Sequence, residues 1–559
     1  MLGLNLTALR CLATLTAGAV LANAPAAFPA GDAADQAMAA IHPEALRADI
    51  RFLSDDLLEG RGTGTRGHLV AAKFMATQFE ALGLQPAGDS GTYFQSVPLR
   101  SLQVDPAAST LTITRAGQPP QSLTMAQDFL AGTDPGRADT SVEGPVVFAG
   151  YGVTAPEQNY DDFKGIDVKG KIIAVLPGAP NFESSLKAHY SSGEVKNKAA
   201  VDHGAIGIIG LDDPVQEKSY AFSKYARDLA TPEFRWLDKQ GRPNDYFPEL
   251  LGGAYLSLPA TEKLFAGAPH QAAEIFALAK DGKPVPVFPL PITAKIRSVT
   301  KSQDVQSPNI LARLEGSDPQ LKNEFVVYSA HLDHLGIGAP VNGDSIYNGA
   351  LDNASGCAAL LEIARAFSAM NPRPRRSMLF VIVTGEEAGL LGSDYFAHYP
   401  TVPKASIVAN VNVDEILMLY PLRDIVAFGA EHSSLDAVIR KAATRLHLVE
   451  SPDPFPDEVD FIRSDQYSFV KQGIPAVCPS PGIKSDDPKI DPTALYNKWE
   501  QERYHQPQDD IDQPGLDFEA GTQFTRYALL VGYLIAQDPQ RPTWNKGDFF
   551  GDHYANAKP

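Results

Sequence analysis

Short apolar runs that each end in acids or histidine recur through residues 326–414. Four stretches show the pattern: VVYSAHLDHLG, GALDNASG, FVIVTGEEAGLLGSDYF and IVANVNVDE. Runs of about four to eight β-branched or large aliphatic residues are typical of strands buried on both faces of a parallel sheet. In open α/β sheets, ligands bind just beyond the carboxyl ends of the strands. We therefore expect a site at this edge, with candidate residues His331, Asp333, Asp352, Glu386, Glu387 and Asp414.

Strands and helices alternate from residue 301 onward. The pattern predicts strands at 309–314, 324–330, 377–384, 405–413, 424–429 and 474–479, and helices at 354–369, 390–398, 433–446, 465–472 and 517–536. Alternation at this spacing predicts an α/β fold with a doubly wound, mostly parallel sheet and crossover helices.

Two further regions precede this alternation. Residues 43–84 predict two helices around a Gly/Thr loop, the second ending at Gly83. Short β-rich runs punctuated by glycine follow, and this change of texture marks an inserted β-rich domain. The predicted organisation is an N-terminal segment of the main domain at 40–140, the insert at 141–300, the rest of the main domain at 301–540 and a tail at 541–559.

The N-terminus has the order of a secretory signal. A lone basic residue, Arg10, precedes an apolar run from Cys11 to about Leu21, and small residues follow. We predict a cleaved signal peptide at residues 1–26 and hence an exported protein, periplasmic or secreted. A disordered Ala-rich tail is the alternative. Elsewhere, no segment of the sequence is long and apolar enough to cross a membrane.

Composition and charge narrow the classes of partner. The chain has 559 residues, 44% hydrophobic, and a formal net charge of −19. This length suggests two or three domains, and the acidic balance argues against nucleic acid or an anionic membrane surface as partner. Cys357 and Cys478 remain after removal of the signal, and the sequence leaves open whether they pair.

Each candidate ligand has a purely structural alternative when it is taken alone. His331 and Asp333 can be a histidine bonded to a neighbouring acid, and Asp352 can cap the helix that follows it. Glu386 and Glu387 are stronger evidence for a metal site, because burial penalises two adjacent charges unless a cation compensates them. One of the two, held just off the metal, can take a proton from bound water.

The candidate ligands carry nitrogen and oxygen donors and no sulfur. His505 joins them from the polar loop WEQERYHQPQDDID, which returns to the sheet before the last predicted helix. Such a set suits a pair of zinc-like ions bridged by one carboxylate, with Co²⁺ or Mn²⁺ as possible substitutes. The predicted metal ligands are His331, Asp352, Glu387, Asp414 and His505.

The motifs AHLDHLG, GDSIYNGALDNASG, TGEEAGLLGS, NVDE and YHQPQDD, in this order, resemble the M28 family of zinc aminopeptidases. The likeness is to the subgroup with an inserted protease-associated (PA) domain, because RFLSDDLLEGRGTGTRG and GDSGTYFQ resemble its N-terminal segment and residues 141–300 its PA insert. The resemblance implies a di-zinc enzyme that hydrolyses N-terminal residues from peptides with a free N-terminus.

The resemblance also implies a role for each site residue. His331 and Asp414 would bind one zinc ion, Glu387 and His505 the other, and Asp352 would bridge them. Glu386 would be the general base, Asp333 would orient His331, and Tyr504 would hydrogen-bond the developing oxyanion. A cis peptide bond is expected after Asp352. Gln466 departs from the family pattern, in which relatives often have histidine, and this puts in doubt a contact lining the substrate pocket.

Other functions remain open on the sequence. A carboxypeptidase-like or dipeptidase-like exopeptidase would use the same metal pair, and only pocket residues would distinguish it. A glutaminyl-cyclase-like enzyme would bind a single zinc ion, so the presence of both His331 and Asp414 favours two metals. A non-enzymatic receptor or scaffold has no reason to keep the complete set of ligands and the base.

Overall fold

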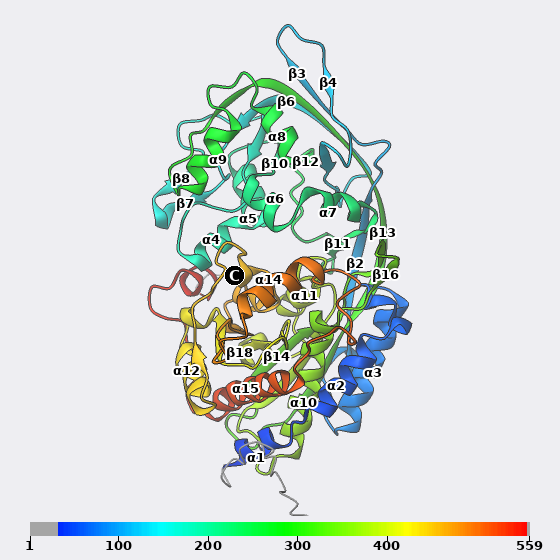
Figure 1. The fold of residues 1–559 in the computed structure, drawn as a ribbon, viewed down its shortest axis with the longest axis vertical. Helices are drawn as coiled ribbons and strands as arrows, with labels where there is room; N and C mark the ends of the chain where they lie inside the picture. Colours follow the sequence, from blue (N-terminus) through cyan, green and yellow to red (C-terminus); the bar gives the residue numbers. More distant parts are fainter. Residues whose placement is uncertain (1–31, 556–559) are drawn as a thin grey trace, which may run out of the picture.

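The computed structural model describes residues 32–555. The predicted signal peptide at residues 1–26 therefore lies outside the described residues. Within the described part of the chain, no helix has the length and apolar character needed to cross a membrane. Figure 1 shows two lobes, joined along one side by the long strands β2 and β13.

The larger lobe is organised around a sheet whose central strands are parallel. β17, β14, β18 and β21 pair in that order and run parallel, as the sequence predicts for a doubly wound α/β fold. Antiparallel strands extend both sides, β13, β2 and β11 next to β17, and β19 with β20 next to β21. The strands are β2 (Phe94–Val104), β11 (Glu233–Trp236), β13 (Phe288–Leu314), β14 (Phe325–His331), β17 (Ser377–Val383), β18 (Ile407–Asn412), β19 (Asp424–Phe428), β20 (Val449–Glu450) and β21 (Ala476–Pro481).

Helices cover both faces of this sheet because its central strands are apolar on both sides. All seven residues of β14 are buried. Val326 and Tyr328 belong to a core shared with one layer of helices, whereas Phe325 and Val327 belong to a core on the opposite face. The first layer holds α1 (Ala33–Ala39), α2 (Pro43–Leu53), α3 (Arg66–Ala81), α10 (Ser355–Ala369), α12 (Leu435–Arg445) and α15 (Phe518–Gln537); the second holds α11 (Leu391–His398) and α13 (Gln466–Val470).

The smaller lobe, residues 105–299 apart from β11, has its own sheet and its own core. Strand β13 spans both lobes: its first half pairs with β3 and β6 here, and its second half with β2 and β17 in the larger lobe. The sheet order is β4, β3, β13, β6, β9, β10, β12, β5. Its other strands are β3 (Thr110–Arg115), β4 (Gln121–Ser122), β5 (Phe129–Ala131), β6 (Asp139–Phe148), β9 (Ile172–Val175), β10 (Gly207–Leu211) and β12 (Gly253–Leu256).

This sheet includes β3, β4 and β5, which lie before the domain boundary expected at residue 141. Side chains from these strands, including Leu111, Ile113 and Phe129, pack into the core of the smaller lobe. The structural unit therefore begins earlier than the change of sequence texture indicates. Its identity as a PA-like domain stays a prediction. The lobe also carries helices α4 (Ser184–Ser191), α5 (Gly193–Asp202), α6 (Pro214–Ser219), α7 (Phe222–Arg227), α8 (Leu258–Leu264) and α9 (Ala272–Lys280).

Candidate metal centre

The predicted ligands meet at the carboxyl edge of the parallel strands, as the sheet topology requires. His331 is the last residue of β14, and Asp414 is the second residue after the end of β18. Asp352 lies in the turn that leads into α10. Glu387 lies in the loop between β17 and α11, and His505 in the loop between α14 (Pro492–Glu502) and α15.

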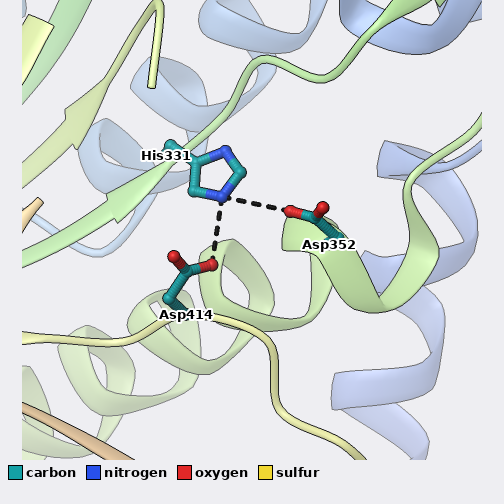
Figure 2. Close-up of side chains that lie close together, drawn as sticks. All are labelled: His331, Asp352 and Asp414. Atoms are coloured by element: carbon teal, nitrogen blue, oxygen red, sulfur yellow. Dashed lines mark hydrogen bonds and ion pairs between the residues drawn. The ribbon is translucent and has the colours of Figure 1, made fainter. Parts of the chain in front are cut away.

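Two groups of ligand atoms form around Asp352. On one side, His331 Nε2 lies 3.0 Å from Asp414 Oδ1 and 3.2 Å from Asp352 Oδ1 (Figure 2). On the other side, His505 Nε2 lies 3.0 Å from Glu387 Oε2 and 3.3 Å from Asp352 Oδ2. Asp352 therefore turns one oxygen toward each group, and the structure brings all five predicted ligands together.

These separations and the donor chemistry fit zinc. Two donors bound to one ion at about 2.1 Å lie roughly 3 to 3.5 Å apart, which matches both groups. Imidazole nitrogens and carboxylate oxygens are ordinary zinc donors, and Co²⁺ or Mn²⁺ also accept them. His331 and Asp352 are 1% and 2% exposed, so they have almost no contact with bulk water.

The charge of the site points the same way. Four carboxylates, those of Asp352, Glu386, Glu387 and Asp414, gather near His331 and His505. Although burial lowers it, the Glu387 and Asp352 carboxylates raise the pKa of His505 to about 10. Negative charge therefore exceeds positive charge among these side chains, and bound cations would balance it.

Glu386 lies beside the ligands without belonging to either group. Its Oε2 is 3.9 Å from His331 Nε2, and its side chain is 9% exposed. Burial holds the pKa of this carboxyl well above its usual range, opposed by His331 and reinforced by the Asp414 carboxylate. This position suits a group that exchanges protons next to a metal site.

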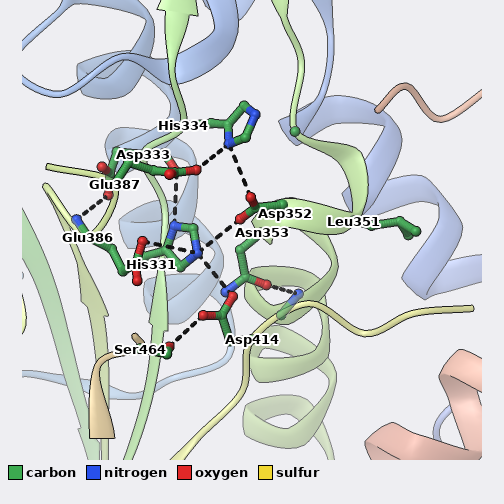
Figure 3. A network of polar contacts seen from close by, with 12 residues as sticks. His331, Asp333, His334, Leu351, Asp352, Asn353, Glu386, Glu387, Asp414 and Ser464 are labelled. Carbon is green, nitrogen blue, oxygen red and sulfur yellow. Dashed lines mark hydrogen bonds and ion pairs between the residues drawn. The ribbon is translucent and has the colours of Figure 1, made fainter. Parts of the chain in front are cut away.

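The contact expected between Asp333 and His331 takes a different form. His331 Nδ1 donates to the main-chain carbonyl of Asp333 at 3.0 Å. The Asp333 carboxylate accepts instead from the Thr63 hydroxyl at 2.9 Å and from the Glu386 main-chain N–H at 3.2 Å. Asp333 thus orients His331 through its backbone, and its side chain holds the Glu386 loop in place (Figure 3).

Tyr504 and Gln466 lie differently with respect to the site. The Tyr504 ring stacks on His505 with centroids 3.9 Å apart, and its hydroxyl accepts from Arg463 at 3.0 Å. Tyr504 and Arg463 both line a cavity of about 340 Å³ that opens onto the ligands. Gln466 is buried and bonds Asn412 and the carbonyl of Phe461, so its departure from the family pattern is a change in the interior rather than in the cavity wall.

Sequence reasoning missed three residues that build the site. His334 Nδ1 lies 2.6 Å from Glu387 Oε1. Asp509 accepts the main-chain N–H groups of Leu351 and Asp352, and the buried Arg61 donates to main-chain carbonyls around the site. The motif HLDH was a visible signal for His334, because it stands three residues after His331 at the same strand end.

Two further expectations concern covalent geometry. The peptide bond between Asp352 and Asn353 is cis, as the resemblance implied. Cys357 and Cys478 are both buried, and neither forms a disulfide within the described part of the chain. The question of pairing left open by the sequence is therefore answered.

Comparison with known proteins supports the family suggested by the motifs. Residues 309–529, which contain all the ligands, match the sequence model of peptidase family M28. Leupeptin-inactivating enzyme 1 of Streptomyces exfoliatus is 36% identical over 109 residues, which are 19% of this chain and 22% of that protein. A probable glutamate carboxypeptidase, LAMP1 of Arabidopsis thaliana, is 24% identical over 379 residues, 63% of this chain and 51% of that protein.

The fold is also shared with a solved structure. An aminopeptidase from Aneurinibacillus sp. strain AM-1 aligns with 91% of this chain and 97% of its own, with a TM-score of 0.54 and 20% identity. The match covers both lobes in extent and shows a common fold. By contrast, the chain spans about a fifth to a half of the length of the curated relatives above.

Proposed function

Because residues 309–529 match the sequence model of peptidase family M28, we propose that this protein is a di-zinc aminopeptidase that cleaves the peptide bond next to a free N-terminus. The observation that carries the proposal is the position of Asp352. One of its oxygens faces His331 and the other faces His505, so a single carboxylate lies between two complete groups of donors. A single-zinc, cyclase-like site would have no use for the group formed by His331 and Asp414.

Bound zinc ions would polarise the scissile carbonyl and lower the pKa of a water molecule toward neutrality. Glu386 is the residue placed to accept the proton of the attacking water and to return it to the leaving amine. Tyr504 is placed to steady the carbonyl oxygen as charge develops. Because Arg463 donates to the Tyr504 oxygen, the phenolic hydrogen remains available for that role.

The charge of the cavity favours a free N-terminus over a free C-terminus as the recognised end. Arg463 is the only lysine or arginine among the described residues of the cavity wall. The acids of the wall, apart from the ligands and Glu386, are Glu415, Asp453, Asp460 and Glu500. Burial raises the pKa of all four acids, to about 7 for Asp460 and Glu500, so they are only partly ionised near neutral pH. A substrate ammonium group stabilises their ionised form, whereas a substrate carboxylate gains nothing from them. This supports an aminopeptidase rather than a carboxypeptidase-like enzyme.

We further propose that the protein is exported. The support is the order of basic, apolar and small residues in the N-terminal sequence. N-terminal sequencing of the protein recovered from outside the cytoplasm would test it. A new N-terminus near residue 27 supports the proposal, and an intact N-terminus in the cytoplasm contradicts it.

The first experiment is zinc analysis of the purified protein, combined with hydrolysis of aminoacyl-p-nitroanilides before and after chelation. Two zinc ions per chain and chelator-sensitive cleavage, abolished when the substrate is N-acetylated, are expected. One zinc ion without cleavage would contradict the proposal in favour of a cyclase-like enzyme. Glu386→Gln should retain both ions while kcat falls about 10²- to 10⁴-fold.

A further inference from the structure

We propose that His334 is a positioning residue that holds Glu387 for the zinc ion on the His505 side. The inference rests on the proposed di-zinc site. His334 Nδ1 lies 2.6 Å from Glu387 Oε1, while the other oxygen of the same carboxylate, Oε2, lies 3.0 Å from His505 Nε2. One oxygen therefore faces the histidine and the other faces the metal group.

His334, Asp352 and Glu387 each place one donor atom within 4.8 Å of the others, a spacing that a metal ion also accepts, but the 2.6 Å separation between His334 and Glu387 is that of a hydrogen bond. Two zinc donors with bonds of about 2.1 Å lie roughly 3 Å or more apart, as do the other ligand pairs of this site. A short N–H···O contact is typical of a carboxylate acceptor. Because Nδ1 is the ring nitrogen that faces Glu387 and a carboxylate accepts hydrogen bonds, Nδ1–H is the donor and Oε1 the acceptor.

The surroundings of His334 leave its ring little choice of direction. The side chain is 1% exposed, and Figure 3 shows it aimed at Glu387 and Asp352. A Cβ on Gly349 would lie 2.6 Å from His334 Cγ, so the main chain of the Asp352 loop passes directly against the ring. The His334 main-chain N–H also donates to the carbonyl of Arg61 at 3.4 Å.

The same arrangement occurs on the other side of the site. Asp414 turns Oδ1 toward His331, and its Oδ2 accepts a hydrogen bond from the Ser464 hydroxyl. Each non-bridging carboxylate thus presents one oxygen to its metal group and gives the other to a protein donor. Asp352 differs because both of its oxygens face metal groups. His334 does for Glu387 what Ser464 does for Asp414, and such partners fix ligand orientation.

The test compares three substitutions in the full chain. His334→Ala removes the donor, His334→Asn places an amide N–H close to the position of Nδ1, and His334→Gln places it closer to Nε2. The matched control is His270→Ala, because His270 Nδ1 makes a similar contact, 2.9 Å from Glu274 Oε1, on the surface of the smaller lobe. Stepwise zinc affinities are measured by competition with a chelator, and thermal unfolding reports whether each variant is folded.

His334→Ala should weaken one of the two zinc-binding steps about 10- to 100-fold and leave the other unchanged. His334→Asn should restore most of the lost affinity, whereas His334→Gln should not. Ser464→Ala should weaken the step that His334→Ala spares. His270→Ala should change neither step.

Several results would overturn the inference. Equal weakening of both steps in His334→Ala would indicate a general structural role. Rescue by glutamine rather than asparagine would indicate that Nε2 is the active nitrogen. Loss of a nitrogen ligand from the Co²⁺ absorption spectrum of His334→Asn would make His334 a direct ligand. If the unsubstituted protein itself binds fewer than two zinc ions, the proposed function fails; if it binds two and His334→Ala behaves like it, only this inference fails.

Discussion

The two lobes both bury carboxylates, but they satisfy them in different ways. In the smaller lobe, Asp162 is 4% exposed and accepts from the N–H groups of Tyr151 and Val153, at 3.0 and 3.1 Å, and from the Tyr160 hydroxyl at 2.6 Å. In the larger lobe, four carboxylates meet around three histidines, His331, His334 and His505. A buried acid surrounded by protein donors is a structural element, whereas buried acids that face one another require a cation or a proton.

The comparison predicts the largest effect at Asp352. Asp352→Ala removes the charge that lies between both groups of donors, so both zinc ions should be lost and hydrolysis should fall to background. Zinc per chain, measured by elemental analysis on protein shown by circular dichroism to be folded, checks this. Normal metal content in the variant would rule out the bridging role.

We expect the next largest effect at Arg61, because this residue donates to main-chain carbonyls close in sequence to the ligands His331 and Asp352. It is fully buried, and its guanidinium donates to the carbonyls of Leu332 at 2.7 Å, Asn348 at 2.6 Å and Gly349 at 2.9 Å. Arg61→Met leaves the carbonyls of Leu332 and Asn348 without this donor, at a cost of about 1–3 kcal/mol for each buried group, whereas the Gly349 carbonyl keeps a hydrogen bond from the Ala354 N–H. The free energy of unfolding should fall by several kcal/mol in a denaturant titration.

A nearby arginine supplies the matched control for this prediction. The Arg66 side chain is 76% exposed and lies 3.7 Å from Glu59. Arg66→Met should change the free energy of unfolding by less than about 1 kcal/mol, as is usual for exposed ion pairs. Equal effects of the two substitutions would show that the buried contacts of Arg61 contribute nothing specific.

The elements of the larger lobe and the five ligands were predictable because their signals are local. Each predicted strand and helix from residue 301 onward is present with small shifts at its ends, except that the strand predicted at 309–314 is only the last part of β13 (Phe288–Leu314). The ligands His331 and Asp414 could be found because a strand that is buried on both faces ends abruptly in a charged side chain. The helix α14 and the hairpin of β15 (Gly336–Val341) and β16 (Asp344–Tyr347) were missed, since neither has a strong apolar period.

The supporting residues could not be predicted, because their roles depend on contacts between distant segments. Arg61 reaches the carbonyl of Leu332 across 271 positions, and His334 reaches Glu387 across 53. Strand β13 was seen only in part, because its first half belongs to the sheet of the smaller lobe and its second half to the other sheet. Local periodicity does not report which partners a strand will find.

The comparison also makes a prediction for Asp162, the buried acid of the smaller lobe that is bonded to protein donors. Asp162→Ala leaves two buried N–H groups without an acceptor, so the free energy of unfolding should fall by about 2–4 kcal/mol. Zinc content and kcat/KM should stay unchanged, because the carboxylate supports only the smaller lobe. Asp162→Asn keeps one acceptor oxygen and should cost less. Loss of zinc in the alanine variant would contradict this prediction, because it would show that Asp162 also supports the metal centre.

The smallest effect is expected at His432, where the lobes meet. Its Nδ1 lies 2.7 Å from Asp548 Oδ2 and its Nε2 lies 3.3 Å from Glu431 Oε1, and Glu431 in turn accepts from Ser185 of the smaller lobe. Although burial lowers it, the hydrogen bond to Asp548 and the neighbouring Glu431 carboxylate raise the pKa of His432 to about 9. A raised pKa means that the folded state favours the protonated ring. The resulting stabilisation is fully present below pH 6.5, the pKa of His432 in the unfolded chain, and it is lost as the pH rises to about 9.

His432→Asn should therefore lower the midpoint of thermal unfolding at pH 6 more than at pH 9.5. The pH-dependent part of this difference has an upper bound of about 3 kcal/mol. Unfolding followed by circular dichroism at both pH values measures it, with zinc content determined in parallel. Zinc content should not change, because the polar partners of His432 are Asp548 and Glu431, and neither is a ligand of the metal centre. The same loss of stability at both pH values would mean that the charge of His432 does not contribute.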